Sequence, residues 1–404
     1  MTNDNLHAKL HASMAGFVAR GEVPGIVALV ACGDDVFVDA VGTTTTGGPD
    51  SQPMRRDTIF RIASLTKPIA AAATMLLVDE GVLRLDDAVE RWLPELANRR
   101  VLKRIDAQLD DTVPARRAIT VRDVLTSCLG FGSVMAPPDT YPIQRPIRDG
   151  HLGGDGPHPA RPPGPDEYMR RLGALPLMYQ PGERWLYNTS CDLMGVLVAR
   201  ASGRSFSTFL NDRLFGPLGM KDTGFSVPAS ELPRLAGCYL FNHGSGKLEV
   251  FDGTGEASDW SHPPPFESGA GGLASTADDY LAFCRMLLNG GVGAVGGARV
   301  LSQGAVEAMT RDQLTPEQRQ GAEIFLGTHS SWGFGMAVNV RSQADEPWVV
   351  PGRFGWDGGY GTSAYSDPKN DLVGILLTQR LLDSPEGPSV YGEFWAGAYG
   401  GLEG

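Results

Sequence analysis

A short strand-like segment passes into a helical one at Phe60-Arg-Ile-Ala-Ser-Leu-Thr-Lys-Pro68, which contains a Ser-x-x-Lys tetrad. The helical composition continues to Glu80, and Gly81 is a typical helix stop. Residues three apart share one face of a helix, so the Lys67 amine can reach the Ser64 hydroxyl. A serine hydroxyl becomes a good nucleophile when a neighbouring base takes its proton, and a buried lysine can be that base. The tetrad therefore favours Ser64 as a nucleophile, with a helix cap and a solvated lysine as the alternative interpretation.

The other sequence motifs are weaker indications of a functional site. A second tetrad, Ser366-Asp-Pro-Lys369, contains a proline between two strand-like runs, and we interpret it as a solvated turn. The segment Gly291–Gly296 fits GxGxxG but follows a helix end rather than a strand, which argues against a dinucleotide site. No P-loop, HExxH or GxSxG motif occurs, and the seven histidines show no metal-ligand spacing. The sequence predicts neither a metal nor a cofactor.

The composition indicates a globular protein of 404 residues, with 42% hydrophobic and 20% charged residues. The 52 Gly and 29 Pro predict many turns. The net charge of −12, without a Lys/Arg cluster, argues against nucleic acid or an anionic membrane as a partner. The apolar run Ile26–Cys32 is far too short to cross a bilayer. Five scattered cysteines without a CxxC motif, and no visible secretory signal, predict a cytoplasmic location.

Strand signals lie at both ends of the sequence, and helical patterns lie between them. The expected strands are Gly25–Cys32, Val36–Val41, Asp57–Ile62, Trp332–Val340, Ala364–Asp367 and Leu372–Thr378. The expected helices are 5–19, Ser64–Glu80, Ile119–Thr126, Trp185–Ser202, Ser275–Asn289 and one near 389–399. The fold class is therefore α/β (α+β), with an antiparallel sheet that is built from both termini and flanked by helices.

The same pattern predicts two structural parts. Residues 1–80 and 325–404 should form the α/β sheet domain, and residues 81–324 an inserted, mainly helical domain. The helical part contains a segment, 132–166, with six Gly and nine Pro, where we expect no regular structure. We interpret it as a loop bordering a site. Its candidate contact residues are Tyr141, Arg145, Arg148, His151 and His158.

The tetrad segment resembles the nucleophile segment of the serine β-lactamase and penicillin-binding-protein superfamily. Within it, the sequence is most similar to class C β-lactamases and the related family VIII carboxylesterases. Further segments resemble the family's landmarks in the same order across about residues 20–380: Ile119–Thr126, Gln180–Asn188, Leu214–Met220, Asp222–Phe225, Gly269–Thr276 and Phe354–Gly359. The resemblance implies a β-lactamase/transpeptidase-like fold and acyl-enzyme chemistry that needs no cofactor.

The resemblance also implies residue roles. Ser64 is the nucleophile, and Lys67 is its proton acceptor or relay. Tyr187 corresponds to the family's catalytic tyrosine, which exchanges protons with the serine and the leaving group. The oxyanion hole is formed by the backbone N–H groups of Ser64 and Gly359.

Two departures from the family pattern bear on the substrate. Thr189 stands where many β-lactamases have an asparagine, although Asn188 adjoins it. Trp356-Asp357-Gly358 replaces the Lys/His-Thr-Gly triplet, and this form resembles the esterases. The missing cation predicts a neutral or cationic acyl substrate, unless Arg145, Arg148 or Arg353 compensates. Asp357 either adds a negative charge to the site or points away from it. The expected substrate-binding residues are Trp356, Asp357, Gly358, Asn188 and Tyr141.

The expected function is hydrolysis of small-molecule carboxylic esters through an acyl-enzyme on Ser64. Alternative activities are acyl transfer in a natural-product pathway and β-lactamase or D-aminopeptidase activity. A further alternative is a binding protein that keeps the enzyme fold without its activity. The expected partner is a small-molecule ester or acyl substrate, and the sequence predicts no particular oligomeric state.

Overall fold

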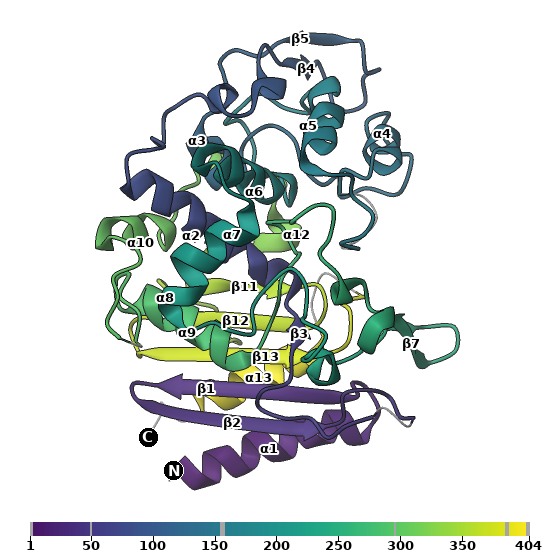
Figure 1. Ribbon diagram of the computed structural model, residues 1–404, viewed down its shortest axis with the longest axis vertical. Coiled ribbons are helices and arrows are strands. Elements are labelled where there is room, and N and C mark those ends of the chain that lie inside the picture. Colours follow the sequence, from purple (N-terminus) through teal and green to yellow (C-terminus); the bar gives the residue numbers. More distant parts are fainter. Residues whose placement is uncertain (1–2, 49–50, 154–157, 295, 384–387, 401–404) are drawn as a thin grey trace.

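The computed structural model describes residues 3–48, 51–153, 158–294, 296–383 and 388–400. Its centre is a seven-stranded antiparallel sheet with the order β2-β1-β13-β12-β11-β10-β9. The strands are β1 Gly25–Cys32, β2 Asp35–Gly42, β9 Ser330–Trp332, β10 Ala337–Asn339, β11 Phe354–Gly358, β12 Thr362–Asp367 and β13 Leu372–Thr378. Figure 1 shows strands from the two ends of the sequence side by side in this sheet. The expected sheet built from both termini is confirmed.

The two faces of the sheet are both buried, which follows from the sequence of its inner strands. In β1, Ile26 and Ala28 face helices α1 (Asn3–Ala19) and α13 (Ser389–Tyr399), whereas Val27 and Leu29 face the main core. Strand β13 alternates in the same way and is buried throughout. This explains its continuous apolar run, because a strand covered on both faces has no polar side.

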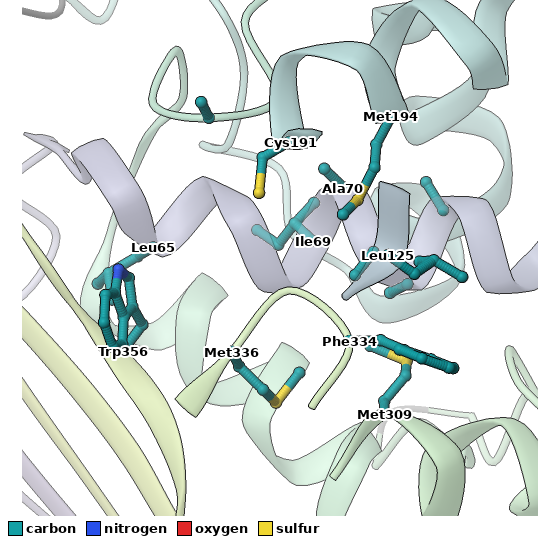
Figure 2. Packing of buried hydrophobic residues seen from close by; sticks show 14 of the residues in the cluster. Leu65, Ile69, Ala70, Leu125, Cys191, Met194, Met309, Phe334, Met336 and Trp356 are labelled. Carbon is teal, nitrogen blue, oxygen red and sulfur yellow. The ribbon is translucent and has the colours of Figure 1, made fainter. Parts of the chain in front are cut away.

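The main core continues from the sheet into the helical part. Helix α2 (Thr66–Asp79) packs against α6 (Thr189–Ser202), and α9 (Ala277–Leu288) packs on the sheet. Figure 2 shows Leu65 in this core together with Trp356 of β11. Because one hydrophobic cluster runs through both parts, the division at residues 80 and 325 stays a prediction.

The remaining helices and strands are short. The helices are α3 Val121–Leu125, α4 Gln144–Asp149, α5 Pro165–Ala174, α7 Phe206–Leu210, α8 Gly216–Leu218, α10 Gln303–Met309, α11 Pro316–Arg319 and α12 Glu323–Leu326. The strands form the pairs β3 Phe60–Arg61 with β8 Ala274–Ser275, β4 Arg100–Leu102 with β5 Thr112–Pro114, and β6 Cys238–Asn242 with β7 Lys247–Asp252.

Four expectations differ clearly from the structure. The strand expected at Asp57–Ile62 spans only Phe60–Arg61, β3. The single strand expected at Trp332–Val340 is two strands, β9 and β10, because the chain turns between them at Gly335, where φ is +74°. The expected helix Trp185–Ser202 begins only at Thr189. Helix α4 lies inside the Gly/Pro-rich segment 132–166, where no regular structure was expected. Residues 154–157 of that segment lie outside the described part of the chain.

Candidate active site

Ser64 lies at the junction of a strand and a helix. It is the middle residue of a 3-10 turn, Ala63–Leu65, and α2 begins two residues later. Ala63 has a φ of +46°, a conformation that a residue with a side chain rarely adopts. The carbonyl of Ile62 accepts hydrogen bonds from the Leu65 amide and the Thr362 hydroxyl, which tie the turn to β12. The sheet therefore fixes the position of the Ser64 side chain.

Two proton-carrying groups meet at the Ser64 hydroxyl. The Lys67 Nζ lies 2.8 Å from the Ser64 Oγ, and the Tyr187 hydroxyl also lies 2.8 Å from it. Lys67 donates a second hydrogen bond, of 2.6 Å, to the carbonyl of Ala270. The Lys67 residue is 0% exposed, so it is not the solvated charge of the alternative interpretation. The arrangement can move a proton between the serine, the lysine and the tyrosine.

A strained turn and an aromatic cluster hold Tyr187. Asn188, with φ +82° and ψ −69°, is the centre of a γ-turn that the Thr189 amide closes onto the Tyr187 carbonyl at 3.2 Å. This turn explains why α6 starts after the tyrosine instead of at Trp185. The Tyr187 ring stacks on Phe325 at a centroid distance of 4.3 Å. Such strain persists only where its surroundings impose it, and it is concentrated at functional sites.

Trp356 of β11 completes the arrangement. Its indole Nε1 donates a 3.0 Å hydrogen bond to the hydroxyl oxygen of Tyr187, which itself donates to Ser64. The Trp356 ring also packs edge-on against Trp332 at 4.8 Å. The indole therefore points the phenol at the serine.

The Ser64 hydroxyl opens into a cavity of about 620 Å³. Six of the expected site residues line it: Ser64, Tyr187, Asn188, Trp356, Asp357 and Gly359. His151 and His158 of the Gly/Pro-rich segment also line it. Tyr141 and Gly358 are not among the lining residues, and Tyr141 packs against the main core instead.

Several lining residues had no signal in the sequence. Trp260, Phe266, Ile324 and Phe325 give the wall its apolar character, and Asp192 of α6 adds a buried carboxylate. They come from loops and helix ends whose path a single sequence does not indicate. Cys191, next to Asp192, belongs to the core (Figure 2), where burial raises the pKa of its thiol to about 12.

The β-lactamase family model matches residues 10–391. The chain belongs to the β-lactamase family. Its similar relatives include Protein Rv1367c of Mycobacterium tuberculosis, 40% identical over 82% of this chain and 80% of that protein. They also include Esterase EstB of Burkholderia gladioli, 30% identical over 95% of this chain and 93% of that protein. The solved structure of EstCE1 shares the fold, with a TM-score of 0.78, 23% identity, and coverage of 98% of this chain and 99% of that chain.

This β-lactamase-family cavity has no Lys or Arg among the described residues that line it. Arg145 and Arg148 lie on α4, where both approach Asp139. Arg353 is 4% exposed and packs over the rings of Tyr365 and Trp395, at 3.9 and 4.1 Å from their centroids. None of the three arginines that might have compensated for the missing cation therefore lines the cavity.

Asp357 borders the cavity, but its carboxylate is held away from the serine. Its Oδ2 accepts a 3.1 Å hydrogen bond from Tyr365, whose ring packs against Trp395 of α13. Trp356, the preceding residue on β11, contacts Tyr187 instead, because neighbouring side chains on a strand point to opposite faces. Burial raises the pKa of Asp357, an effect that the Arg353 charge partly offsets. Of the two orientations expected from the sequence, the structure has the one that points away.

The described residues hold no group of three or more His, Cys, Asp or Glu side chains suited to a metal ion. Within the same part of the chain, no helix combines the length and apolar character that crossing a bilayer requires.

Proposed function

We propose that this serine hydrolase of the β-lactamase fold cleaves carboxylic esters of small molecules through an acyl-enzyme on Ser64. The observation that carries the proposal is the 2.8 Å approach of both Lys67 Nζ and Tyr187 OH to the Ser64 Oγ at the cavity wall. A serine that is contacted by two groups able to carry its proton is suited to attack a carbonyl carbon.

In the acylation step, the Ser64 oxygen bonds to the ester carbonyl carbon while its proton passes to Lys67 or Tyr187. The carbonyl oxygen becomes an oxyanion, and we assign its donors to the backbone N–H groups of Ser64 and Gly359. Gly359 suits this role because a Cβ built there would meet nothing within 4 Å, so a substrate can approach the backbone. The C–O bond to the alcohol then breaks, and Tyr187 returns the proton to the departing oxygen.

In the deacylation step, a water molecule attacks the acyl-enzyme and gives one proton to the same pair of groups. The bond from the acyl carbon to Ser64 breaks, the serine regains a proton, and the carboxylic acid leaves. Trp356 supports both steps, because its N–H donates to the Tyr187 oxygen and stabilises negative charge there.

The charge of the cavity favours neutral or cationic esters. The carboxylate of Asp192 borders it, whereas none of its described lining residues is Lys or Arg. A substrate carboxylate would lose its hydration there without gaining an opposite charge. The mostly apolar wall supplies the area that a neutral acyl group or alcohol buries. EstB, similar over almost the whole chain, is named as an esterase, which agrees with an ester as the substrate.

A second candidate is transfer of the acyl group to an alcohol or amine instead of water. EstCE1, which shares the fold, is described as a hydrolase with promiscuous acyltransferase activity. The cavity of about 620 Å³ has room for an acyl group together with an acceptor. The two candidates differ in one measurable respect, which is whether the acyl-enzyme decays faster with an added acceptor than with water.

The test is hydrolysis of short-chain p-nitrophenyl esters by the wild type, Ser64→Ala and Tyr187→Phe. We expect activity in the wild type that falls by about 10³-fold or more in Ser64→Ala. Activity that survives Ser64→Ala would remove the proposed nucleophile. An inactive wild type whose Ser64 is still labelled by a fluorophosphonate would favour the transferase, and addition of small alcohols would then restore turnover.

A further inference from the structure

Asp192 is a buried carboxylate that the proposed chemistry does not use. It lies in the first turn of α6, five residues after Tyr187, and is 6% exposed. Burying a carboxylate is costly unless hydrogen bonds or an opposite charge compensate. Its position beside the catalytic groups therefore calls for an explanation.

The hydrogen bonds of Asp192 lead to Lys67 through one turn of the chain. Its Oδ1 accepts from the Ser268 hydroxyl at 2.5 Å and from the Ala270 backbone N–H at 3.2 Å. The carbonyl of the same Ala270 accepts the 2.6 Å hydrogen bond from Lys67 Nζ. One residue thus connects the carboxylate of α6 to the amine of α2.

The turn 268–271 lies tightly against α6. A Cβ added at Gly269 would collide with the carbonyl oxygen of Cys191, so only glycine allows this approach. The Ser268 hydroxyl also accepts hydrogen bonds from the Ala270 and Gly271 amides, which closes the turn. Movement of the Asp192 side chain would therefore move the carbonyl that holds Lys67.

Asp192 also acts on Lys67 by its charge. The titratable groups that face the carboxylate are Lys67, Cys191 and Tyr168, and Lys67 is the cation among them. Lys67 in turn faces Tyr187 and Cys191 besides Asp192. The carboxylate therefore attracts the lysine head group and helps to hold it in place.

We propose that Asp192 is a positioning residue for Lys67. It fixes the Ala270 carbonyl that orients the lysine, and its charge attracts the lysine head group. The inference rests on the proposed function, because it assumes that Lys67 exchanges a proton with Ser64.

The test compares Asp192→Asn with two other variants. Asparagine keeps an oxygen for the Ser268 and Ala270 donors but removes the charge, whereas Ser268→Ala keeps the charge and loses a donor. Asp279→Asn is the matched control. Asp279 is also 6% exposed, also lies in the first turn of a helix, and also accepts from a hydroxyl and a backbone amide, of Thr223 and Asp222.

The readouts are kcat and KM for a p-nitrophenyl ester, with thermal unfolding measured in parallel. For Asp192→Asn we expect kcat to fall about tenfold with little change in KM, because the lysine loses the charge that holds its head group beside Ser64. In Ser268→Ala kcat should fall as well, because the turn that carries the Ala270 carbonyl loses a hydrogen bond. Asp279→Asn should change only the unfolding temperature.

A wild-type kcat in a folded Asp192→Asn protein would overturn the inference, and so would an equal loss of kcat in Asp279→Asn. If Asp192→Asn does not fold, Ser268→Ala decides the matter, since it leaves Asp192 in place and should still lower kcat. A failure of the proposed function looks different, because the wild type would then keep its activity after Ser64→Ala.

Discussion

The hydrogen bond from Trp356 to Tyr187 is the contact in the site that one conservative substitution tests most directly. Trp356→Phe removes the indole N–H, which lies 3.0 Å from the Tyr187 oxygen, and keeps an aromatic ring at the same place. The phenol then loses the donor that orients it toward Ser64 and that stabilises negative charge on its oxygen.

The expected loss follows from the value of one hydrogen bond. Hydrogen bonds to charged groups contribute about 1.5–3 kcal/mol, and every 1.36 kcal/mol of barrier is tenfold in rate. If the tyrosine oxygen carries negative charge in the transition state, kcat/KM should fall by about 10- to 150-fold. Most of the loss should lie in kcat, because the missing contact is strongest in the transition state.

Trp332 provides the matched control. It packs edge-on against Trp356 at 4.8 Å and is fully buried, but its indole N–H has no acceptor among the described residues. Trp332→Phe therefore removes a ring of the same size and no hydrogen bond. Both variants should unfold at a lower temperature than the wild type, whereas only Trp356→Phe should lose activity in the p-nitrophenyl ester assay.

Equal activity losses in the two variants would refute the reasoning, because they would attribute the effect to packing. Wild-type activity in Trp356→Phe would refute it as well, since the tyrosine would then act without its donor.

Three further predictions concern the rest of the chain. Gly269→Ala should lower kcat by more than tenfold in the ester assay, because the new Cβ collides with the Cys191 carbonyl and displaces the turn that holds Lys67. A thiol reagent should label Cys32 alone in the native protein and all five cysteines after denaturation, as the other four are buried. Arg234 lowers the pKa of Asp222 below its ordinary 3.8, so this pair contributes stability above that pH and loses it as the pH falls. In urea denaturation between about pH 6 and pH 3, the stability difference between wild type and Arg234→Met should shrink toward the acid end.

The core of the site could be predicted from the sequence because its chemistry is local. Ser64 and Lys67 are three residues apart, so a single turn brings them together, as the spacing indicates. Tyr187 is 123 positions away from Ser64, and no spacing rule connects them. Only the resemblance of the segment around Tyr187 to the family's tyrosine motif predicts its place in the site.

The elements that the sequence did not predict depend on tertiary contacts. The γ-turn at Asn188 is unfavourable by itself, and the local sequence pattern predicts a helix that runs across it. Helix α4 forms in a proline-rich segment where Ile143 and Ile147 are buried against the main core. Tertiary packing stabilises both the turn at Asn188 and helix α4, and the pattern of a single sequence does not show which surfaces pack together.

Asp357 shows how strand geometry changes the meaning of a charge. In the sequence alone, Asp357 of the Trp-Asp-Gly triplet suggests an anion that lies beside the substrate and repels carboxylates. On strand β11 it must face away from its neighbour Trp356, and the Tyr187 contact fixes Trp356 on the side of the serine. The carboxylate therefore meets Tyr365 on the far side, near Arg353. The discrimination against carboxylate substrates that we propose then depends less on repulsion by Asp357. It depends more on the lack of a lysine or arginine in the described lining, where tryptophan occupies position 356.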